Sequence, residues 1–193
     1  HRAELDAAAR VAKALGAASH RVVRVELNAF GGSALTDASI AVPKSPTEGI
    51  PVTYVPARNT ILLSMALAHA EVLNADAIFT GANAVDYSGY PDCRDNTLKA
   101  LQVAISLGLD SPMTIETPLM WLTKAQTWAL SEQLGGGALN DLIVEHTHTC
   151  YLGDRGHRHA WGYGCGECPS CQLRAQGHAA WVAAQDQGQG QGV

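Results

Sequence analysis

Four cysteines near the C-terminal end of the chain carry the clearest chemical signal in the sequence. They follow a C-x14-C-x2-C-x2-C spacing as Cys150, Cys165, Cys168 and Cys171. Thiolates repel one another and are costly to bury, so four converging sulfurs need a cation between them or pairing into disulfides. Disulfides between cysteines that are three residues apart would close small, strained loops. The spacing therefore predicts that the four sulfurs bind one metal ion.

The sequence favours zinc as that ion. Zinc takes a closed tetrahedral shell of four thiolates. Gly164 and Gly166 would supply the unusual backbone angles of such a knuckle, and Pro169 would stiffen it. A four-iron, four-sulfide cluster is an alternative, because consecutive C-x2-C steps followed by a more distant cysteine also occur in ferredoxin-like sites. A cysteine-rich loop without an ion is the third interpretation.

A second candidate site is the loop of residues 81–94, which is dense in hydrogen-bonding side chains and aromatic rings. Carboxylates such as Asp86 and Asp92 could accept hydrogen bonds from the ring N–H and exocyclic amine of a purine-like base. Tyr87 or Tyr90 could stack on the face of that base. The alternative is an ordinary polar turn with two satisfied aspartates.

Arg58 and Lys124 stand at the starts of predicted helices. Backbone N–H groups and the helix dipole make such a position an anion site, which a cationic side chain can complete. Phosphate is the anion that we expect there. The alternative is that both are solvated surface cations.

The periodicity of apolar residues predicts alternating helices and strands that would position these groups. Helices are expected at 3–15, at 60–73 after an Asn59 cap, from Asp95 or Asn96, and from a Thr123–Gln126 capping box to about Leu134, where Gly135, Gly136 and Gly137 end it. The helix at 60–73 is expected to face inward with Ile61, Met65, Ala68 and Val72. Strands are expected at 21–27, 75–80 and 113–116. This alternation predicts an α/β fold with a parallel sheet, whose ligands bind at the carboxyl ends of the strands.

The chain divides into three predicted parts. Residues 1–144 form the α/β domain, residues 145–178 a small metal-binding subdomain, and residues 179–193, rich in Gln and Gly, a flexible tail. A long loop runs to about residue 51 after the first strand. We expect a surface hairpin between the first two metal cysteines.

Composition and charge narrow the function classes. With 193 residues, 47% of them hydrophobic and 16% charged, the chain can bury one sizeable core. Its formal net charge is -5, from 13 basic and 18 acidic residues, so we expect no direct nucleic-acid partner. The sequence shows neither an apolar run of membrane-spanning length nor a signal peptide, and reduced metal-binding thiols belong in a reducing compartment. We therefore expect a cytoplasmic protein that does not bind membranes.

Taken together, the motifs resemble those of the 7-cyano-7-deazaguanine synthase family, from the first residues to about Gly177. The ordered set is far more specific than any single motif. The matching segments are 31–37 (GGSALTD), 55–59 (VPARN), 83–94, 117–119 (TPL) with 122–124 (LTK), 150–151 (CY) and 165–174 (CGECPSCQLR).

The resemblance implies a Rossmann-like, three-layer α/β fold of the adenine nucleotide α-hydrolase type, and a ligase of queuosine biosynthesis that forms a C–N bond. ATP would adenylate 7-carboxy-7-deazaguanine with release of pyrophosphate, and ammonia would displace AMP to give an amide. A second activation would dehydrate the amide to the nitrile. Magnesium would accompany ATP, zinc would be structural, and the chain would form a homodimer. The protein's task would be positioning and charge stabilisation.

The resemblance also assigns residues to these roles. The four cysteines would be the structural zinc ligands, and Arg58 and Lys124 would be the catalytic cations on the phosphate side. The base would be recognised by Asn83, Asp86, Tyr87, Tyr90, Asp92 and Arg94.

Two features depart from the family pattern. The N-terminal strand with its Ser-Gly-Gly-x-Asp-Ser phosphate loop is absent, and residues 31–33 do not replace it, so we expect the 193-residue chain by itself to make no nitrile. The gap between Cys150 and Cys165 is also longer than usual. The alternative functions are a non-catalytic zinc-bearing interaction module and another ATP pyrophosphatase such as a tRNA thiolase. A thiolase would need a basic surface and a reactive cysteine pair, and neither is evident.

Overall fold

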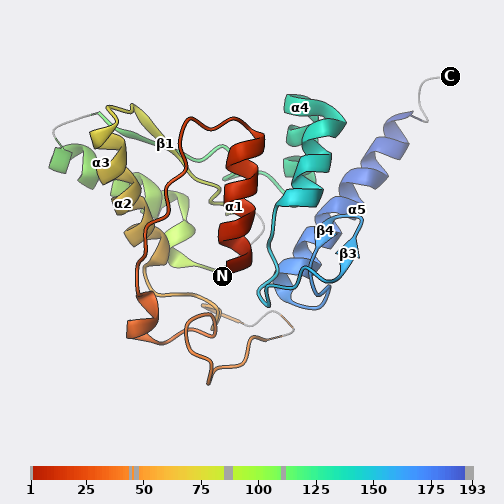
Figure 1. Cartoon of the computed structure of the whole chain (residues 1–193), viewed down its shortest axis with the longest axis horizontal. Helices are drawn as coiled ribbons and strands as arrows, with labels where there is room; N and C mark the ends of the chain where they lie inside the picture. Colours follow the sequence, from red (N-terminus) through yellow and green to blue (C-terminus); the bar gives the residue numbers. More distant parts are fainter. Residues whose placement is uncertain (1, 44, 46–47, 85–88, 110–111, 190–193) are drawn as a thin grey trace. The chain divides into compact units, whose positions relative to one another are not determined.

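The computed structural model describes residues 2–43, 45, 48–84, 89–109 and 112–189 (Figure 1). Its helices, with η for 3-10 helices, and its strands are α1 (Arg2–Ala14), η1 (Leu27–Phe30), α2 (Arg58–Val72), β1 (Ala77–Phe79), η2 (Pro91–Cys93), α3 (Asp95–Leu109), β2 (Thr114–Glu116), α4 (Lys124–His146), β3 (Arg158–His159), β4 (Gly162–Tyr163) and α5 (Pro169–Gln189). They form two compact units, and each is described by itself. Unit 1 comprises His1–Glu26, Val42–Pro46 and Thr123–Val193, and unit 2 comprises Leu27–Ala41 and Thr47–Leu122.

Unit 2 is built around a parallel strand pair. β1 and β2 align Ala77 with Thr114 and Phe79 with Glu116, which confirms the predicted parallel pairing in a sheet of two strands. Helix α2 packs on β1 and α3 packs on β2, and the two helices also contact each other (Figure 1). Two clusters fill the core, and their buried members are Leu63, Leu98 and Met120 in one and Leu67, Ala70 and Met113 in the other.

The inward face of α2 differs from the prediction. Leu63, Leu67 and Ala70 are buried, whereas Val72 is 77% exposed. The apolar residues of α2 are spread over several sides of the helix, so their periodicity alone could not predict which side is buried. The helix also begins one residue before the predicted cap: Ala57, with a left-handed φ of 54°, takes the N-cap position, and Asn59 lies inside the helix.

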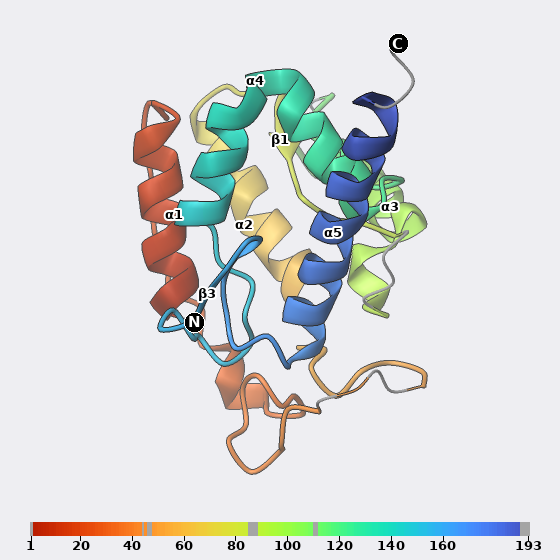
Figure 2. The same cartoon turned by 90° about the vertical axis from the view of Figure 1, so that its right-hand side faces the viewer.

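Unit 1 is a group of helices with a small hairpin. Helix α4 packs along α5 and against α1, and Figure 2 shows α1 and α5 flanking α4. Between α4 and α5, the ring of Trp128 stacks on Trp181 with centroids 5.7 Å apart and meets His178 edge-on at 5.1 Å. The predicted capping box is confirmed, because Gln126 N–H donates to Thr123 Oγ1 at 3.2 Å and Thr123 N–H donates to Gln126 Oε1 at 2.8 Å.

The glycine run in α4 bends the helix and does not end it, which corrects the predicted stop near Leu134. Gly136 leaves the helical region, with φ 60° and ψ -162°, and the helix then resumes to His146. Side chains bridge the bend: Ser131 Oγ donates to Asn140 Oδ1, and Asn140 Nδ2 donates to Glu132 Oε2. These hydrogen bonds, the first buried and the second partly buried, hold the two halves of the helix together, so the glycines produce a kink.

The strand predicted at residues 21–27 is wrong. This segment has no regular structure before η1 begins at Leu27, and Val22 and Val23 are 61% and 60% exposed. A β-branched run becomes a strand only when a neighbour accepts its backbone hydrogen bonds. Among the described residues, no strand pairs with it.

The C-terminal part also differs from the sequence-based boundaries. Helix α5 continues through Gln189, so residues 179–189 are helical where a flexible tail was expected. Unit 1 joins residues from both ends of the chain, and no unit boundary falls at 144–145. Within the described ranges, every helix is too short or too polar to cross a membrane.

Candidate metal centre and ligand-binding loops

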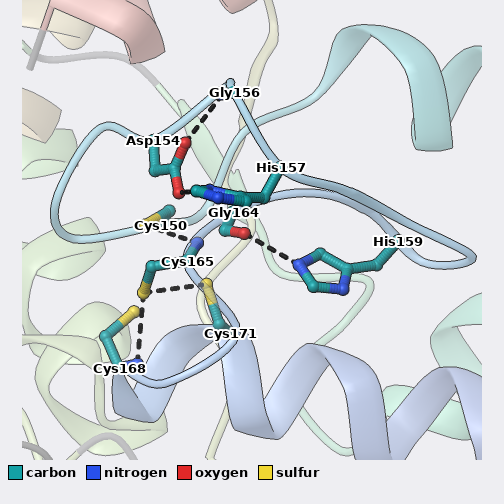
Figure 3. Close-up of polar contacts among 9 residues, drawn as sticks. All are labelled: Cys150, Asp154, Gly156, His157, His159, Gly164, Cys165, Cys168 and Cys171. Carbon is teal, nitrogen blue, oxygen red and sulfur yellow. Dashed lines mark hydrogen bonds and ion pairs between the residues drawn. The ribbon is translucent and has the colours of Figure 1, made fainter.

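The four cysteines converge in unit 1, as Figure 3 shows. Cys150 follows α4, Cys165 and Cys168 follow β4, and Cys171 lies in the first turn of α5, where Pro169 takes the first helical position. Their Sγ atoms all lie within 4.8 Å of one another, and those of Cys165 and Cys171 are 4.0 Å apart. A tetrahedral shell with metal–sulfur bonds of about 2.3 Å places sulfurs roughly 3.8 Å apart. The cluster could therefore hold one metal ion with small adjustments.

The environment of the sulfurs fits a cation at their centre. Cys150 and Cys171 are fully buried and Cys168 is nearly so. Burial by itself would raise the pKa of Cys150, but N–H groups of Cys165, Asp154 and Leu152 act against it and bring this pKa down to about 7. Burial raises the pKa of Cys168 and Cys171. Buried thiols in such close contact become stable thiolates when a metal ion neutralises them.

The backbone around the cluster is shaped for sulfur. Cys165 N–H donates to Cys150 Sγ at 3.5 Å, and Cys168 N–H donates to Cys165 Sγ at 3.3 Å. A Cβ on Gly164 would lie 2.6 Å from Cys171 Sγ and 3.3 Å from Cys150 Cβ, so only glycine fits there. Gly166 has a left-handed φ of 77°. Both glycines that the sequence marked are thus required by the geometry.

The segment between Cys150 and Cys165 is a hairpin, as predicted. β3 and β4 pair antiparallel, with Arg158 opposite Tyr163. The His159 ring stacks on Trp161 with centroids 4.4 Å apart, and its Nε2 lies 2.9 Å from the Gly164 carbonyl oxygen (Figure 3). Residues of this hairpin therefore pack directly beside the four-cysteine cluster.

The polar loop after β1 lies in unit 2. Asp86 and Tyr87 lie outside the described residues. Asn83 Nδ2 donates to the carbonyl oxygens of Leu119 at 2.6 Å and Leu122 at 2.5 Å. This amide therefore joins the loop after β1 to the segment after β2, which is the carboxyl edge of the sheet.

Tyr90 and Asp92 connect the same loop to residues 53–59. The Tyr90 hydroxyl lies 2.8 Å from Thr53 Oγ1, and its ring centroid is 5.7 Å from that of Tyr54. Asp92 is buried, and its carboxylate accepts from the backbone N–H of Asn59 at 2.8 Å and from Asn59 Nδ2 at 3.2 Å. Tyr90 and Asp92 thus fix the loop from the inside, while Arg94 is exposed.

The two cations that were predicted to bind phosphate each begin a helix, and the two helices belong to different units. Arg58 is the first residue of α2 in unit 2, and Lys124 is the first residue of α4 in unit 1. Gly177 of α5 lets the Lys124 backbone approach, because a Cβ there would lie 2.2 Å from Lys124 Cβ. Next to Arg58, burial and the charge of Asp92 raise the pKa of Cys93, and the Arg58 charge opposes them.

The sequence reasoning did not find several structural partners. The sequence pattern indicates Asn59 as a helix cap and as part of the 55–59 motif, and it indicates no role for Thr53 or Tyr54. Arg174 is buried, and the sequence pattern places it in the cysteine motif without giving it a role. Its position three residues after Cys171 was the available signal, because residues three apart share one helix face.

A parallel βα unit and a four-cysteine cluster that could hold a metal ion define an α/β protein with a candidate metal centre. The model of the family described as "Queuosine biosynthesis protein QueC" matches residues 1–182. The chain belongs to this family, which has an adenine nucleotide α-hydrolase-like fold. The family resemblance drawn from the sequence motifs is confirmed.

Curated proteins named 7-cyano-7-deazaguanine synthase are similar to the chain. The protein from Leptothrix cholodnii is 66% identical over 134 residues, which is 69% of this chain and 57% of the relative. That from Methylibium petroleiphilum is 58% identical over 157 residues, 81% of this chain and 66% of the relative. That from Acidovorax sp. is 50% identical over 191 residues, 95% of this chain and 79% of the relative. The chain thus spans 57% and 66% of the length of the first two relatives.

Proposed function

We propose that the chain belongs to an enzyme that converts 7-carboxy-7-deazaguanine, ammonia and ATP into 7-cyano-7-deazaguanine in queuosine biosynthesis. The observation that carries this proposal is the family match over residues 1–182, together with the shared name of its similar relatives. The parallel strand pair with α2 and α3 is consistent with part of a larger, three-layer sheet structure. The proposed location is the cytoplasm, and the proposed assembly is a homodimer.

The loop of residues 83–94 would bind the base. Asn83, Tyr90 and Asp92 make hydrogen bonds within unit 2, so they would set the shape of this pocket wall. The exposed guanidinium of Arg94 would be free to meet the substrate carboxylate, and the resemblance adds Asp86 and Tyr87. Arg58 and Lys124, each at a helix N-terminus, would neutralise phosphate charge alongside the magnesium of ATP.

We propose zinc as the ion of the four-cysteine centre. Four converging thiolates, three of them buried, match a closed structural zinc shell, which would supply folding free energy rather than chemistry. Elemental analysis of fresh protein tests this: one zinc per chain in a colourless sample is expected. Two or more irons per chain with visible absorption would instead indicate an iron–sulfur cluster.

Binding of the acid tests the proposed substrate. Calorimetry of the zinc-loaded chain should detect 7-carboxy-7-deazaguanine, and adenine should not compete, because it presents a different pattern of ring donors and acceptors. Arg94→Ala should weaken binding, whereas Lys99→Ala on the exposed face of α3 should not. A folded, zinc-loaded chain that gives no heat with the acid would contradict the proposal.

Nitrile formation tests the reaction. The protein as the cell makes it is incubated with the acid, ammonia, magnesium and ATP, and the products are separated by mass spectrometry. We expect the nitrile with release of AMP and pyrophosphate. Release of ADP and inorganic phosphate, or conversion that does not need ammonia, would contradict the proposed route.

A further inference from the structure

Arg174 is a buried cation one helical turn after a metal cysteine. It lies on α5 and is 8% exposed. Its Nε donates to the carbonyl oxygen of Trp161 at 2.8 Å, and its second guanidinium nitrogen donates to the carbonyl oxygen of Ile143 at 3.1 Å. One side chain therefore joins α5 to the hairpin and to the last turn of α4.

The carbonyl of Ile143 lies in the last turn of α4, and it also accepts hydrogen bonds from the backbone N–H of Thr147 at 3.2 Å and from Thr147 Oγ1 at 2.6 Å. A cation is favoured there by the helix dipole. Cys150 follows this helix end by a short segment. The contact between Arg174 and Ile143 thus restrains the end of α4, and with it the short segment that leads to Cys150.

The charge of Arg174 suits a thiolate site. Four thiolates around a divalent ion leave a formal charge of about -2, which is costly in a buried setting. Burial lowers the pKa of Arg174 to about 10 while the nearby Cys171 charge opposes this, so the guanidinium stays protonated at neutral pH. Its central carbon also lies 5.6 Å from the Trp128 ring centroid, where a cation is attracted by the ring face.

Gly162 shows independently that the hairpin is built around this guanidinium. Its φ is +119°, and a Cβ there would lie 2.9 Å from the Val144 carbonyl oxygen and 3.1 Å from the Arg174 guanidinium. Only glycine lets the hairpin approach the end of α4 with Arg174 between them.

We propose that Arg174 is a positioning residue of the metal centre: it balances the thiolate charge and locks the end of α4 and the hairpin in the arrangement that brings Cys150 to the other three cysteines. This inference rests on the proposed metal function of the cluster. Side chains that hold metal ligands in place affect metal affinity nearly as strongly as the ligands do.

The test compares Arg174→Met and Arg174→Lys with the parent chain. Zinc affinity is measured by chelator competition, and ligand geometry by the visible spectrum of the Co2+ form. Methionine keeps the volume but loses charge and hydrogen bonds, so zinc affinity should fall about 10- to 100-fold and the tetrahedral Co2+ bands should shift or weaken. Lysine keeps the charge but cannot make the two hydrogen bonds of the planar guanidinium. The zinc affinity of Arg174→Lys should therefore lie between those of the parent chain and Arg174→Met.

Arg158→Met is the matched control. Arg158 lies on the same hairpin, is 58% exposed, and contacts Glu145 only at 3.7 Å, so its loss should leave both readouts unchanged. If Arg174→Met does not fold, Gly162→Ala takes its place in the test. This variant keeps the guanidinium of Arg174 but displaces it, because the new Cβ would lie 3.1 Å from a guanidinium nitrogen. Gly162→Ala should lower zinc affinity, while Gly156→Ala should not.

The outcomes separate this inference from the proposed metal site. If Arg174→Met, or Gly162→Ala in its place, has the zinc affinity and the Co2+ bands of the parent chain, the proposed role of Arg174 is overturned. The proposed metal site would then still stand. Arg174→Lys with the affinity of the parent would show that charge suffices and would refute the positioning role. A parent chain that takes up neither Co2+ nor zinc would overturn the metal centre and this inference together.

Discussion

The carboxylate of Asp92 accepts a hydrogen bond from the backbone N–H of Asn59 at 2.8 Å, across 33 residues of sequence. Asn59 is the second residue of α2, and the N-cap residue Ala57 makes no side-chain cap. Asp92 therefore caps α2 from a distant loop, and its negative charge lies at the positive end of the helix dipole. The candidate phosphate-side cation Arg58 is held in the same turn.

Asp92→Ala should destabilise unit 2. It removes two hydrogen bonds to a buried carboxylate and leaves the Asn59 N–H without this acceptor, so the free energy of unfolding should fall by about 2 to 3 kcal/mol. Urea unfolding followed by far-UV circular dichroism measures the change. Lys99→Ala is the control, because Lys99 is 73% exposed in its ion pair with Asp95 and should cost less than about 0.5 kcal/mol. Equal losses in both variants would refute the capping role.

Gly164→Ala should damage the metal centre more than it damages the hairpin. Its new Cβ would meet Cys171 Sγ at 2.6 Å, so the sulfurs must spread and zinc affinity should fall at least about tenfold. Gly156→Ala in the same hairpin meets only an Asp154 oxygen at 3.4 Å and should bind zinc normally. Chelator competition measures both variants. Zinc affinity of Gly164→Ala equal to that of the parent would show that the sulfurs do not need this close approach.

Metal removal should change the number of reactive thiols. All five cysteines are free of disulfides, and four of them form the cluster. With an ion bound, a thiol reagent should modify only Cys93, slowly because burial raises its pKa. After chelation, all five should react, and the thermal unfolding temperature should fall because metal binding free energy is folding free energy. Four rapidly reacting thiols before chelation would contradict an occupied site.

His157 should titrate above its ordinary pKa of about 6.5. The Asp154 carboxylate lies 2.6 Å from His157 Nδ1, and this hydrogen bond, aided by the opposite charge, raises the pKa of His157. The ion pair between protonated His157 and the Asp154 carboxylate stabilises the folded state below about pH 6.5. This contribution is lost as the pH rises through the raised pKa of His157.

NMR titration of the imidazole protons checks this expectation. Asp154→Asn should return His157 to its ordinary range. His178 is the internal reference, because burial, with the charge of Arg174, lowers its pKa and Asp154→Asn should not move it. An unchanged His157 titration in Asp154→Asn would show that another group raises its pKa.

Local signals in the sequence correctly predicted several elements. The Thr123–Gln126 capping box begins α4, and the strands at 77–79 and 114–116 lie where apolar density predicted them. The cysteine spacing predicted a cluster that the structure brings within 4.8 Å. Each of these features depends on residues a few positions apart, or on a chemical need that few residue types meet.

Distant partners decided the remaining features. The Val-rich run at 21–27 is not a strand, because no described strand accepts its hydrogen bonds, and the glycines of α4 kink the helix because Ser131, Glu132 and Asn140 bridge the bend. Asp92 remains a predicted base acceptor, and only the structure shows that its carboxylate also caps α2 through Asn59.

The sequence by itself determined the family, the four cysteines that form the cluster and the order of most elements, because these depend on the spacing and type of residues along the chain. The tertiary structure alone decided which face of α2 is buried, which carboxylate caps it, and where the guanidinium of Arg174 lies. These depend on which surfaces and backbone groups meet across long stretches of chain. Burial and hydrogen-bond satisfaction, rather than local preference, select among them.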